Sequence, residues 1–236
     1  MSTETGRGLV EDAGVLIIGG AGGIGFATAE RFAREGGRVM IADLALDAAQ
    51  LAAEKLRDSG AEAEAVMIDV RDSDSAVAAV AATVQAWSRL DCAFNCAGWE
   101  GTSQPAAVVA EQDWLTMVDI KLNGVFRGVQ AQLAQMQSQG SGSIVNMAGT
   151  FGLVGVANHA SYCAAAHGVL GLTKAAALEI ADQGIRINAV CPHAVDAPML
   201  HRMMGGEEEA RRIFSELLAI GRVCTPNEVA EAVVWL

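Results

Sequence analysis

The stretch Val15-Leu16-Ile17-Ile18-Gly19-Gly20-Ala21-Gly22-Gly23-Ile24-Gly25 joins a short apolar run to a glycine-rich loop. A run of aliphatic residues that ends in glycines is typical of a buried parallel strand. Apolar residues then recur at helical spacing over residues 26–33, which predicts a helix directly after the loop. A strand, a glycine-rich turn and a helix in this order predict a phosphate-binding site, because the N–H groups of a helix N-terminus favour an anion.

The same alternation of strands and helices continues along the chain. Further strands are predicted at 39–42, 65–68, 92–94, 143–146 and 186–190, and further helices at 45–59, 74–88, 111–138 and 160–182. No low-complexity linker or internal repeat interrupts the sequence, so one domain over residues 1–236 is expected. The pattern predicts an α/β fold with a Rossmann-like, doubly wound parallel sheet in a three-layer αβα arrangement. Ligands are expected at the carboxyl ends of its strands.

Composition excludes several classes of function. A net charge of −12 and a pI of about 4.7 argue against binding to nucleic acid or to an anionic membrane surface. No apolar run approaches the roughly 18–20 residues of a membrane span, and residues 1–11 lack the basic start and apolar core of a secretory signal. The five cysteines show neither a Cys-x-x-Cys pair nor zinc spacing, so reduced thiols, no metal site and a cytoplasmic location are expected.

The glycine-rich loop and the next strand predict the kind of nucleotide. Gly19 provides the tight turn, Gly23 lets the backbone approach a pyrophosphate, and Gly25 lets helix and strand pack closely. Asp43 follows the second predicted strand, where a carboxylate accepts hydrogen bonds from an adenosine ribose and repels a 2′-phosphate. Asp43 therefore favours NAD over NADP, with a role as a helix N-cap as the alternative.

Nearly the whole chain resembles the short-chain dehydrogenase/reductase family. Asp69-Val70 resembles the pair that holds the adenine ring, and Asn95-Cys96-Ala97-Gly98 resembles the family's Asn-Asn-Ala-Gly segment. The resemblance implies NAD as cofactor, bound by Gly19, Gly23, Ile24, Gly25, Asp43, Asp69, Val70, Asn95 and Gly98. Family members usually carry a further strand after the last helix, whereas this sequence stops within that helix, so the last strand is expected to be absent.

The resemblance also marks the catalytic positions, and most of them are altered. Residues 160–166 resemble the family's Tyr-x-x-x-Lys helix, which implies Tyr162 as general acid/base, but Ala166 stands at the lysine. Gly149, thirteen positions before Tyr162, stands at the catalytic serine, and Lys121 stands at the catalytic asparagine. A free phenol has a pKa of about 10 and is a poor base near pH 7 without a cation beside it. The sequence therefore predicts an NAD-dependent alcohol/ketone oxidoreductase whose hydride transfer is largely abolished.

Three interpretations of these changes remain open. The first is a redesigned active site, as in an engineered variant, in which Lys121 forms a Schiff base with a carbonyl substrate or His193 acts as a base, alone or by activating Cys96. The second is an NAD-dependent oxidoreductase with residual activity through Tyr162. The third is a non-catalytic nucleotide-binding pseudoenzyme.

Each of these residues also has a purely structural interpretation. Lys121 could extend its amine to solvent, His193 could be an ordinary loop histidine, and Cys96 could be a small buried hydrophobic residue. An amine held at position 121 in an apolar site would instead be desolvated, which disfavours its charged form. The expected partners are a small-molecule substrate and a second copy of the chain, as a homodimer or homotetramer, because the helices at 111–138 and 160–182 are apolar all round.

Overall fold

The structure is a computed structural model that describes residues 8–236, and within them the strands form one parallel sheet. The strands are β1 (Gly14–Ile18), β2 (Arg38–Asp43), β3 (Ala63–Met67), β4 (Cys92–Asn95), β5 (Gly142–Met147) and β6 (Ile185–Val190). Their order is β3-β2-β1-β4-β5-β6, so the direction of winding reverses between β1 and β4. This is the doubly wound order, and its reversal point is where such folds bind ligands.

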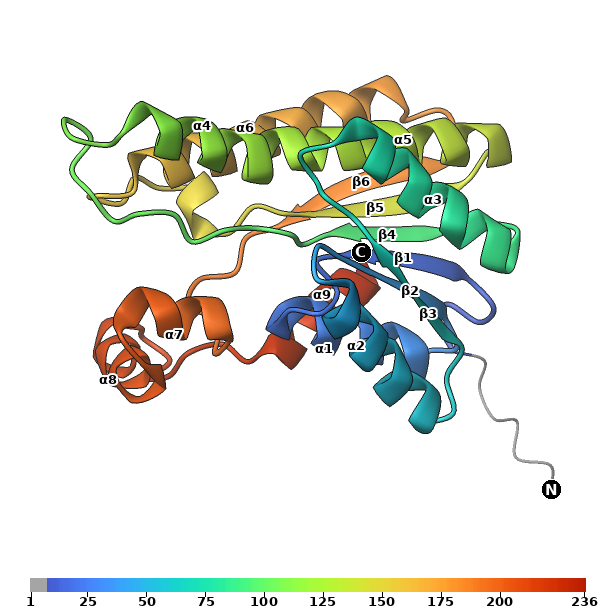
Figure 1. Cartoon of the computed structure of the whole chain (residues 1–236), viewed down its shortest axis with the longest axis horizontal. Coiled ribbons are helices and arrows are strands. Elements are labelled where there is room, and N and C mark those ends of the chain that lie inside the picture. The colour runs from blue at the N-terminus through green and yellow to red at the C-terminus, as the bar shows by residue number, and fades with distance from the viewer. Residues whose placement is uncertain (1–7) are drawn as a thin grey trace.

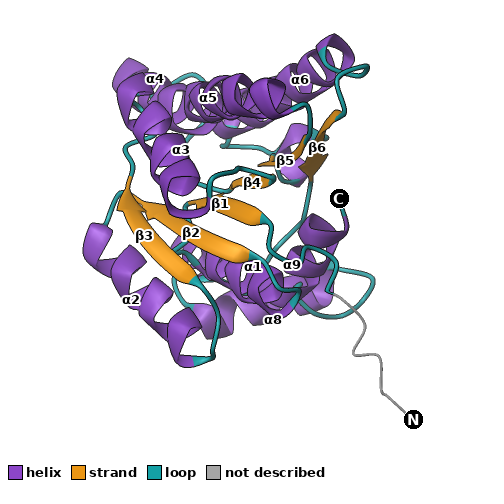
Figure 2. Ribbon diagram, turned by 90° about the vertical axis from the view of Figure 1, so that its right-hand side faces the viewer, coloured by secondary structure: helices purple, strands orange, loops and turns teal. Residues whose placement is uncertain are grey.

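Helices cover both faces of the sheet (Figures 1 and 2). They are α1 (Gly23–Arg34), α2 (Leu46–Asp58), α3 (Ser73–Trp87), α4 (Glu111–Val118), α5 (Gly124–Gln139), α6 (Ala160–Glu179), α7 (Pro198–Met204), α8 (Glu207–Leu217) and α9 (Pro226–Trp235). In Figure 1, α3 to α6 lie above the sheet and α1, α2 and α9 lie below it. The predicted α/β fold in three αβα layers is confirmed.

Each face of the sheet has its own hydrophobic core. Leu16 and Ile18 of β1 belong to the core under α3, α5 and α6, whereas Val15 and Ile17 belong to the core that contains Phe32 of α1. Alternate residues of a strand point to opposite faces, so a strand buried on both sides is apolar throughout. That is why the run at residues 15–18 could be recognised as a strand.

The predicted helix at 111–138 is divided into α4 and α5 by a π-helical turn, Asp119–Asn123. Directly after the turn, a Cβ atom on Gly124 would lie 2.9 Å from Cβ of Val70, so α5 begins in close contact with the segment after β3. The π-helical turn accommodates one extra residue in the helix and changes the direction of its side chains. Lys121 lies in the middle of this turn.

Helices α7 and α8 form a separate small pair beyond the carboxyl ends of the strands (Figure 1). Their shared apolar residues include Leu200, Ala210 and Phe214, in a cluster distinct from the two main cores. The sequence patterns did not predict these two helices.

Within residues 8–236, no helix is long and apolar enough to cross a membrane. In the same part of the chain, no three His, Cys, Asp or Glu side chains are grouped as metal ligands. The expectation about a secretory signal concerns residues 1–11, of which 1–7 lie outside the described residues.

Candidate active site

Three glycines in the loop after β1 occupy positions where a side chain would collide or come into very close contact. Gly19 has φ +81°, and a Cβ on it would lie 2.7 Å from the backbone nitrogen of Ala97. A Cβ on Gly25 would lie 2.1 Å from the carbonyl oxygen of Gly19, and one on Gly23 would lie 3.1 Å from Cβ of Ala197. Glycine at these positions therefore allows the loop, the segment after β4 and the segment before α7 to approach at backbone distance.

The N-terminus of α1 is free to hold an anion. Its N-cap residue is Gly22, no side chain caps it, and its first turn contains no acidic residue. The first N–H groups of a helix carry partial positive charge and have no partner within the helix. A phosphate group fits this end. Ile24, the second residue of α1, accepts a hydrogen bond on its carbonyl oxygen from Oγ1 of Thr28 at 2.8 Å.

Asp43 ends β2 beside this loop. One carboxylate oxygen accepts a hydrogen bond from the backbone N–H of Ala21 at 3.1 Å, and the other accepts one from Ala45 at 3.2 Å. The N-cap residue of α2 is Ala45, and no side-chain hydrogen bond caps that helix. Asp43 therefore connects the glycine-rich loop to the start of α2.

Asp69 and Val70 follow β3, and both have protein partners. The guanidinium of Arg71 donates to both carboxylate oxygens of Asp69, the shortest contact being 2.7 Å, and it lowers the pKa of that carboxyl. The carbonyl oxygen of Val70 accepts a hydrogen bond from Arg127 of α5 at 3.1 Å. Arg71 and Arg127 therefore each bind one of the two residues that the resemblance assigns to the adenine.

Asn95, at the end of β4, belongs to a buried polar network that joins the sheet to two helices. Its amide donates to Gln132 of α5 at 3.0 Å and to Asn146 of β5 at 2.8 Å, and Asn146 donates to Thr173 of α6 at 3.0 Å. Gln132 donates back to Asn95 at 2.8 Å. A satisfied network of this kind fixes the relative positions of the elements it connects. Gly98, three residues later, is exposed.

Tyr162 and Lys121 lie against each other. Tyr162 is in the first turn of α6, and its ring packs edge-on against Phe151 with 5.1 Å between centroids. The Nζ atom of Lys121 lies over the Tyr162 ring, 4.6 Å from its centroid, in the geometry of a cation–π contact. The structure therefore brings two of the three predicted catalytic residues together.

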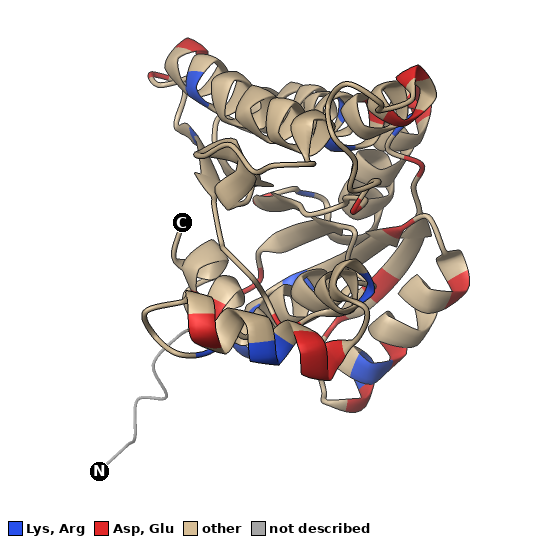
Figure 3. Cartoon of the chain, turned by 90° about the vertical axis from the view of Figure 1, so that its left-hand side faces the viewer, with Lys and Arg blue, Asp and Glu red and all other residues tan. Residues whose placement is uncertain are grey.

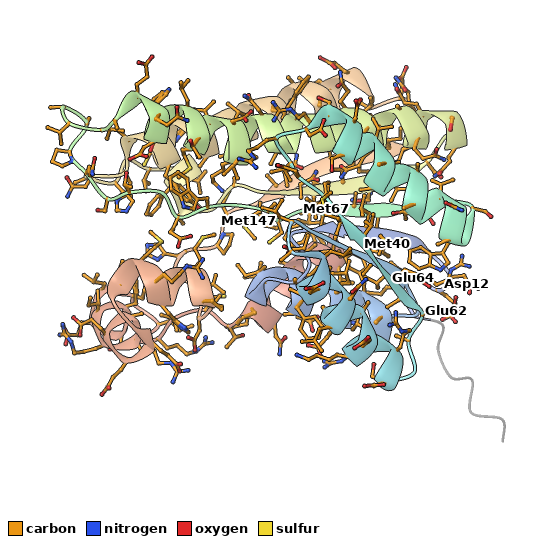
Figure 4. All side chains as sticks on the ribbon, in the orientation of Figure 1. Asp12, Met40, Glu62, Glu64, Met67 and Met147 are labelled. Carbon is orange, nitrogen blue, oxygen red and sulfur yellow. The ribbon has the colours of Figure 1, made fainter. Side chains whose placement is uncertain are left out.

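The Lys121 side chain is buried, with 2% of its surface exposed, so the interpretation that it extends to solvent is wrong. Its hydrogen bond goes to the carbonyl oxygen of Met147 at 3.5 Å, which is long for an N–H···O bond. Figure 4 labels Met147 toward the left, where β5 ends. It labels Asp12 and Glu62 toward the right, just before the amino ends of β1 and β3. Among the described residues, no carboxylate lies within ion-pair distance of Lys121.

Gly149 and Ala166 add no polar side chain to this site. Gly149 has φ +83°, and the nearest atom to a Cβ built on it would be the carbonyl oxygen of Pro192, at 3.8 Å. Ala166 is completely buried. Thr150 begins a short 3₁₀ turn after β5, and its hydroxyl is 3.4 Å from that same carbonyl oxygen of Pro192.

A cavity of about 330 Å³ lies elsewhere in the described chain. Its lining includes Cys92, Ser143 and Arg186, at or next to the amino ends of β4, β5 and β6. This cavity is therefore at the opposite ends of the strands from Lys121, whose amine lies at Met147, the last residue of β5.

His193 is separate from the Tyr162–Lys121 pair. It is exposed, its ring packs edge-on against Phe214 of α8 at 5.6 Å, and its Nδ1 accepts a hydrogen bond from the backbone N–H of Ala194. Burial raises the pKa of the Cys96 thiol to about 12, which disfavours its thiolate and so its role as a nucleophile. Cys96 is partly buried and packs against the core that contains Ile17, which favours its interpretation as a small hydrophobic residue.

Sequence reasoning missed the connection between α7 and the segment after β4. The guanidinium of Arg202 binds the carboxylate of Glu100 at 2.5 and 3.1 Å and lowers the pKa of that carboxyl. These residues are 102 positions apart in the sequence, and no local pattern could have paired them.

Known proteins are similar to this chain over nearly its whole length. The chain matches the family model described as enoyl-(acyl carrier protein) reductase over residues 19–236. Cyclohexanol dehydrogenase of Acinetobacter sp. (strain SE19) is 38% identical over 221 residues, which cover 94% of this chain and 86% of that protein. Levodione reductase of Leifsonia aquatica is 36% identical over 229 residues, which also cover 94% of this chain and 86% of that protein.

Solved structures show the same likeness in three dimensions. The crystal structure of levodione reductase superposes with a TM-score of 0.88 at 37% identity and covers 96% of this chain and 90% of that chain. A variant of actinorhodin polyketide ketoreductase, crystallised with NADPH, superposes with a TM-score of 0.91 at 38% identity and covers 95% of this chain and 90% of that chain. The match therefore includes the sheet, the glycine-rich loop and the helix that carries Tyr162. The chain belongs to the short-chain dehydrogenase/reductase family and has its oxidoreductase scaffold.

Proposed function

We propose that this chain binds NAD but has lost most of the ability to transfer hydride between alcohols and ketones. The observation that carries the proposal is the composition of the site. Tyr162 keeps its hydroxyl, while Gly149 and Ala166 present no polar side-chain atom. Lys121, at the position of the asparagine, contacts the Tyr162 ring.

The nucleotide part of the proposal rests on the loop and on Asp43. The uncapped N-terminus of α1 fits a pyrophosphate, and the Asp43 carboxylate at the end of β2 fits ribose hydroxyls better than a 2′-phosphate. The ketoreductase structure has NADPH, so the proposed preference for NAD rests on the Asp43 carboxylate of this chain. When bound, the nicotinamide supplies or accepts the hydride. Tyr162 acts as the general acid/base that gives a proton to, or takes one from, the substrate oxygen.

The loss of activity follows from the missing hydrogen-bond donors. A substrate oxygen in this site has the Tyr162 hydroxyl but no side-chain donor from position 149 or 166. Removing one preorganised donor from a developing oxyanion costs about 2.7–4 kcal/mol of transition-state stabilisation. The rate of hydride transfer is therefore expected to be ~10³-fold or more below that of a family member with the complete set.

Two measurements test the proposal. Secondary alcohols, with cyclohexanol among them, are incubated with NAD while the absorbance of the reduced nicotinamide is followed. Isothermal titration with NAD and with NADP measures binding separately. Turnover at an ordinary enzyme rate of ~1–10³ s⁻¹ contradicts the loss of hydride transfer. Binding without any turnover favours a pseudoenzyme, and slow turnover that disappears in Tyr162→Phe favours residual activity through the tyrosine.

A second candidate function is carbonyl chemistry at the amine of Lys121. It is favoured by the burial of Lys121 and by its contact with Tyr162, in a site where the other altered residues are small. The residues at 121, 149 and 166 all differ from the family pattern and belong to one active site. This concentration supports the interpretation that the active site was redesigned as a whole, as in an engineered variant. His193 has less support as the new base, because its ring faces Phe214.

We also propose a homodimer or homotetramer in the cytoplasm. The oligomer is supported by exposed apolar residues on α4, α5 and α6, and a reducing compartment by the five cysteines, which are all free thiols.

A further inference from the structure

The chain has three lysines, and they differ sharply in their surroundings. Lys55 on α2 and Lys174 on α6 are exposed, whereas Lys121 is buried. A buried ammonium ordinarily has a carboxylate partner, because taking an unpaired charge out of water costs free energy. Lys121 has a single long contact with a carbonyl oxygen and the face of an aromatic ring instead.

The amine lies where three strands end. Its hydrogen-bond acceptor is Met147, the last residue of β5. Its charge also acts on the thiols of Cys96, just after β4, and Cys191, just after β6, where it partly offsets the increase in pKa that burial causes. The carboxyl ends of the central strands are where this type of sheet binds its substrates. The Lys121 amine is therefore at the end of the sheet where this type of fold binds ligands.

We propose that Nζ of Lys121 forms an imine with a small aldehyde or ketone, with the hydroxyl of Tyr162 moving the protons. The inference rests on the proposed function, since it uses the site in which hydride transfer is reduced. A lysine amine can add to a carbonyl carbon to form an imine, and the Lys121 amine is buried, beside the Tyr162 ring and without a carboxylate partner among the described residues.

The reaction requires no oxidant or reductant. The lone pair of the amine forms a C–N bond to the carbonyl carbon, the carbonyl oxygen receives a proton from Tyr162, and the nitrogen returns a proton to the tyrosinate, which gives a neutral carbinolamine. Tyr162 then protonates the carbinolamine hydroxyl, which leaves as water as the nitrogen lone pair forms the C=N bond. The iminium nitrogen finally gives its proton back to the tyrosinate. The net change is one amine and one carbonyl compound converted into one imine and one water.

The surroundings favour an apolar carbonyl compound. Phe151 packs against Tyr162 on one side, and a Cβ built on Gly149 would meet only the carbonyl oxygen of Pro192, at 3.8 Å. Met199 of α7 extends its methyl group to 3.8 Å from the Cβ position of Gly98. A small aldehyde or ketone with an uncharged hydrocarbon arm matches these contacts.

Trapping by reduction tests the proposal directly. The whole protein is incubated with acetaldehyde, treated with sodium borohydride, digested and analysed by mass spectrometry for lysines that carry an ethyl group. The expected result is modification of Lys121 several-fold above that of Lys55 and Lys174, which serve as internal controls. Lys121 unmodified, or modified no more than the two exposed lysines, overturns the proposal.

Variants separate chemistry from folding. Lys121→Met should lose the preferential label, while Lys174→Met, a change on the exposed side of α6, should keep it. Tyr162→Phe keeps the ring that packs on Phe151 but removes the hydroxyl, and it should slow labelling of Lys121 by about 10²-fold or more. If circular dichroism shows that Lys121→Met does not fold, two results still test the proposal. They are the labelling of Lys121 relative to Lys55 and Lys174 in wild type, and the rate of labelling in Tyr162→Phe. Labelling unaffected in Tyr162→Phe refutes the proton role.

The two proposals fail in different ways. Rapid oxidation of alcohols with NAD contradicts the proposed loss of hydride transfer and says nothing against a labelled lysine. Absence of preferential labelling contradicts the imine and leaves the loss of hydride transfer standing.

Discussion

Nζ of Lys121 and the ring of Tyr162 come from different helical segments, yet they lie 4.6 Å apart, with the amine over the face of the ring. Lys121 is in the π-helical turn between α4 and α5, and Tyr162 is in the first turn of α6. Ala166 is one helical turn further along α6, on the same side as Tyr162. Because the Lys121 amine lies over the Tyr162 ring, we expect positions 121 and 166 to be interdependent.

Placing a lysine at 166 without removing the one at 121 should destabilise the protein. Ala166→Lys puts a second cation beside a buried one, and we expect the free energy of unfolding to fall by about 3 kcal/mol or more. The double variant Lys121→Asn/Ala166→Lys should recover much of that loss and raise alcohol oxidation with NAD by about 10²-fold or more. Urea unfolding and kcat/KM for both single variants and the double variant form the cycle that checks this. Additive effects on stability would contradict the interdependence.

Asp43 should decide the choice of nucleotide. Asp43→Ala removes a charged acceptor near the ribose position, so NAD affinity should fall by about 1.5–3 kcal/mol. NADP affinity should rise, because the repulsion of its 2′-phosphate disappears. Isothermal titration with both nucleotides measures the two changes, and Asp47→Ala, on the neighbouring helix, is the matched control. If NADP already binds wild type more tightly than NAD, the assignment to Asp43 is wrong.

Cys96 should be inert in the folded protein. Burial raises its pKa to about 12, so the thiolate is scarce at pH 8 and becomes common only as the pH approaches 12. Iodoacetamide at pH 8 should leave Cys96 unmodified until the protein is unfolded, and peptide mass mapping gives the extent at each cysteine. Fast alkylation of native Cys96 would revive its role as a nucleophile.

The Glu100–Arg202 ion pair should control how firmly α7 and α8 are held. Arg202 lowers the pKa of Glu100, so the pair stabilises the docked helices at neutral pH. That stabilisation is lost as the pH falls below the ordinary glutamate range and through the lowered pKa. Hydrogen exchange over residues 198–217 should therefore increase in Arg202→Gln at neutral pH, and the difference from wild type should vanish in strong acid. Both partners are partly exposed, so the effect on global stability should be small.

An oligomer should depend on the outer faces of α4, α5 and α6. Figure 3 shows few charged residues along the helices of this layer. Leu178 is 81% exposed, and Trp114 and Phe126 are also exposed. Phe126→Glu should shift gel filtration toward the mass of one chain, 24.4 kDa, while the same change at exposed Leu217 of α8 should not. Wild type eluting as a monomer would exclude the assembly.

The sheet could be predicted because its signal is local. Strands buried on both faces are continuous apolar runs, and residues 15–18 and 39–42 are of that kind. The glycines of the loop could be predicted because a close backbone approach requires them, as the contact of Gly25 with Gly19 shows.

The position of Lys121 could not be predicted, because it depends on contacts between distant segments. Its helix contains a π-helical turn next to Gly124, which packs on Val70, and this contact has no signature in the residues around 121. Sequence left burial and solvent exposure of Lys121 equally open. The α7–α8 pair was missed because its apolar cluster is small and its cross-connection, Glu100 with Arg202, is long-range.

The positive φ at Gly149 makes a hydroxyl side chain difficult to introduce at that position. A serine there would have to adopt φ +83° and ψ 165°, a region that is almost only populated by glycine, at a cost of about 1–3 kcal/mol, or move the peptide that leads into the 3₁₀ turn. The single change Gly149→Ser is therefore expected to lower the stability of the protein. Position 166 would still be an alanine, without an amine beside Tyr162. A variant meant to carry both a hydroxyl at 149 and an amine at 166 would therefore also need a rearranged backbone before the 3₁₀ turn, whereas the Lys121 amine already lies against Tyr162.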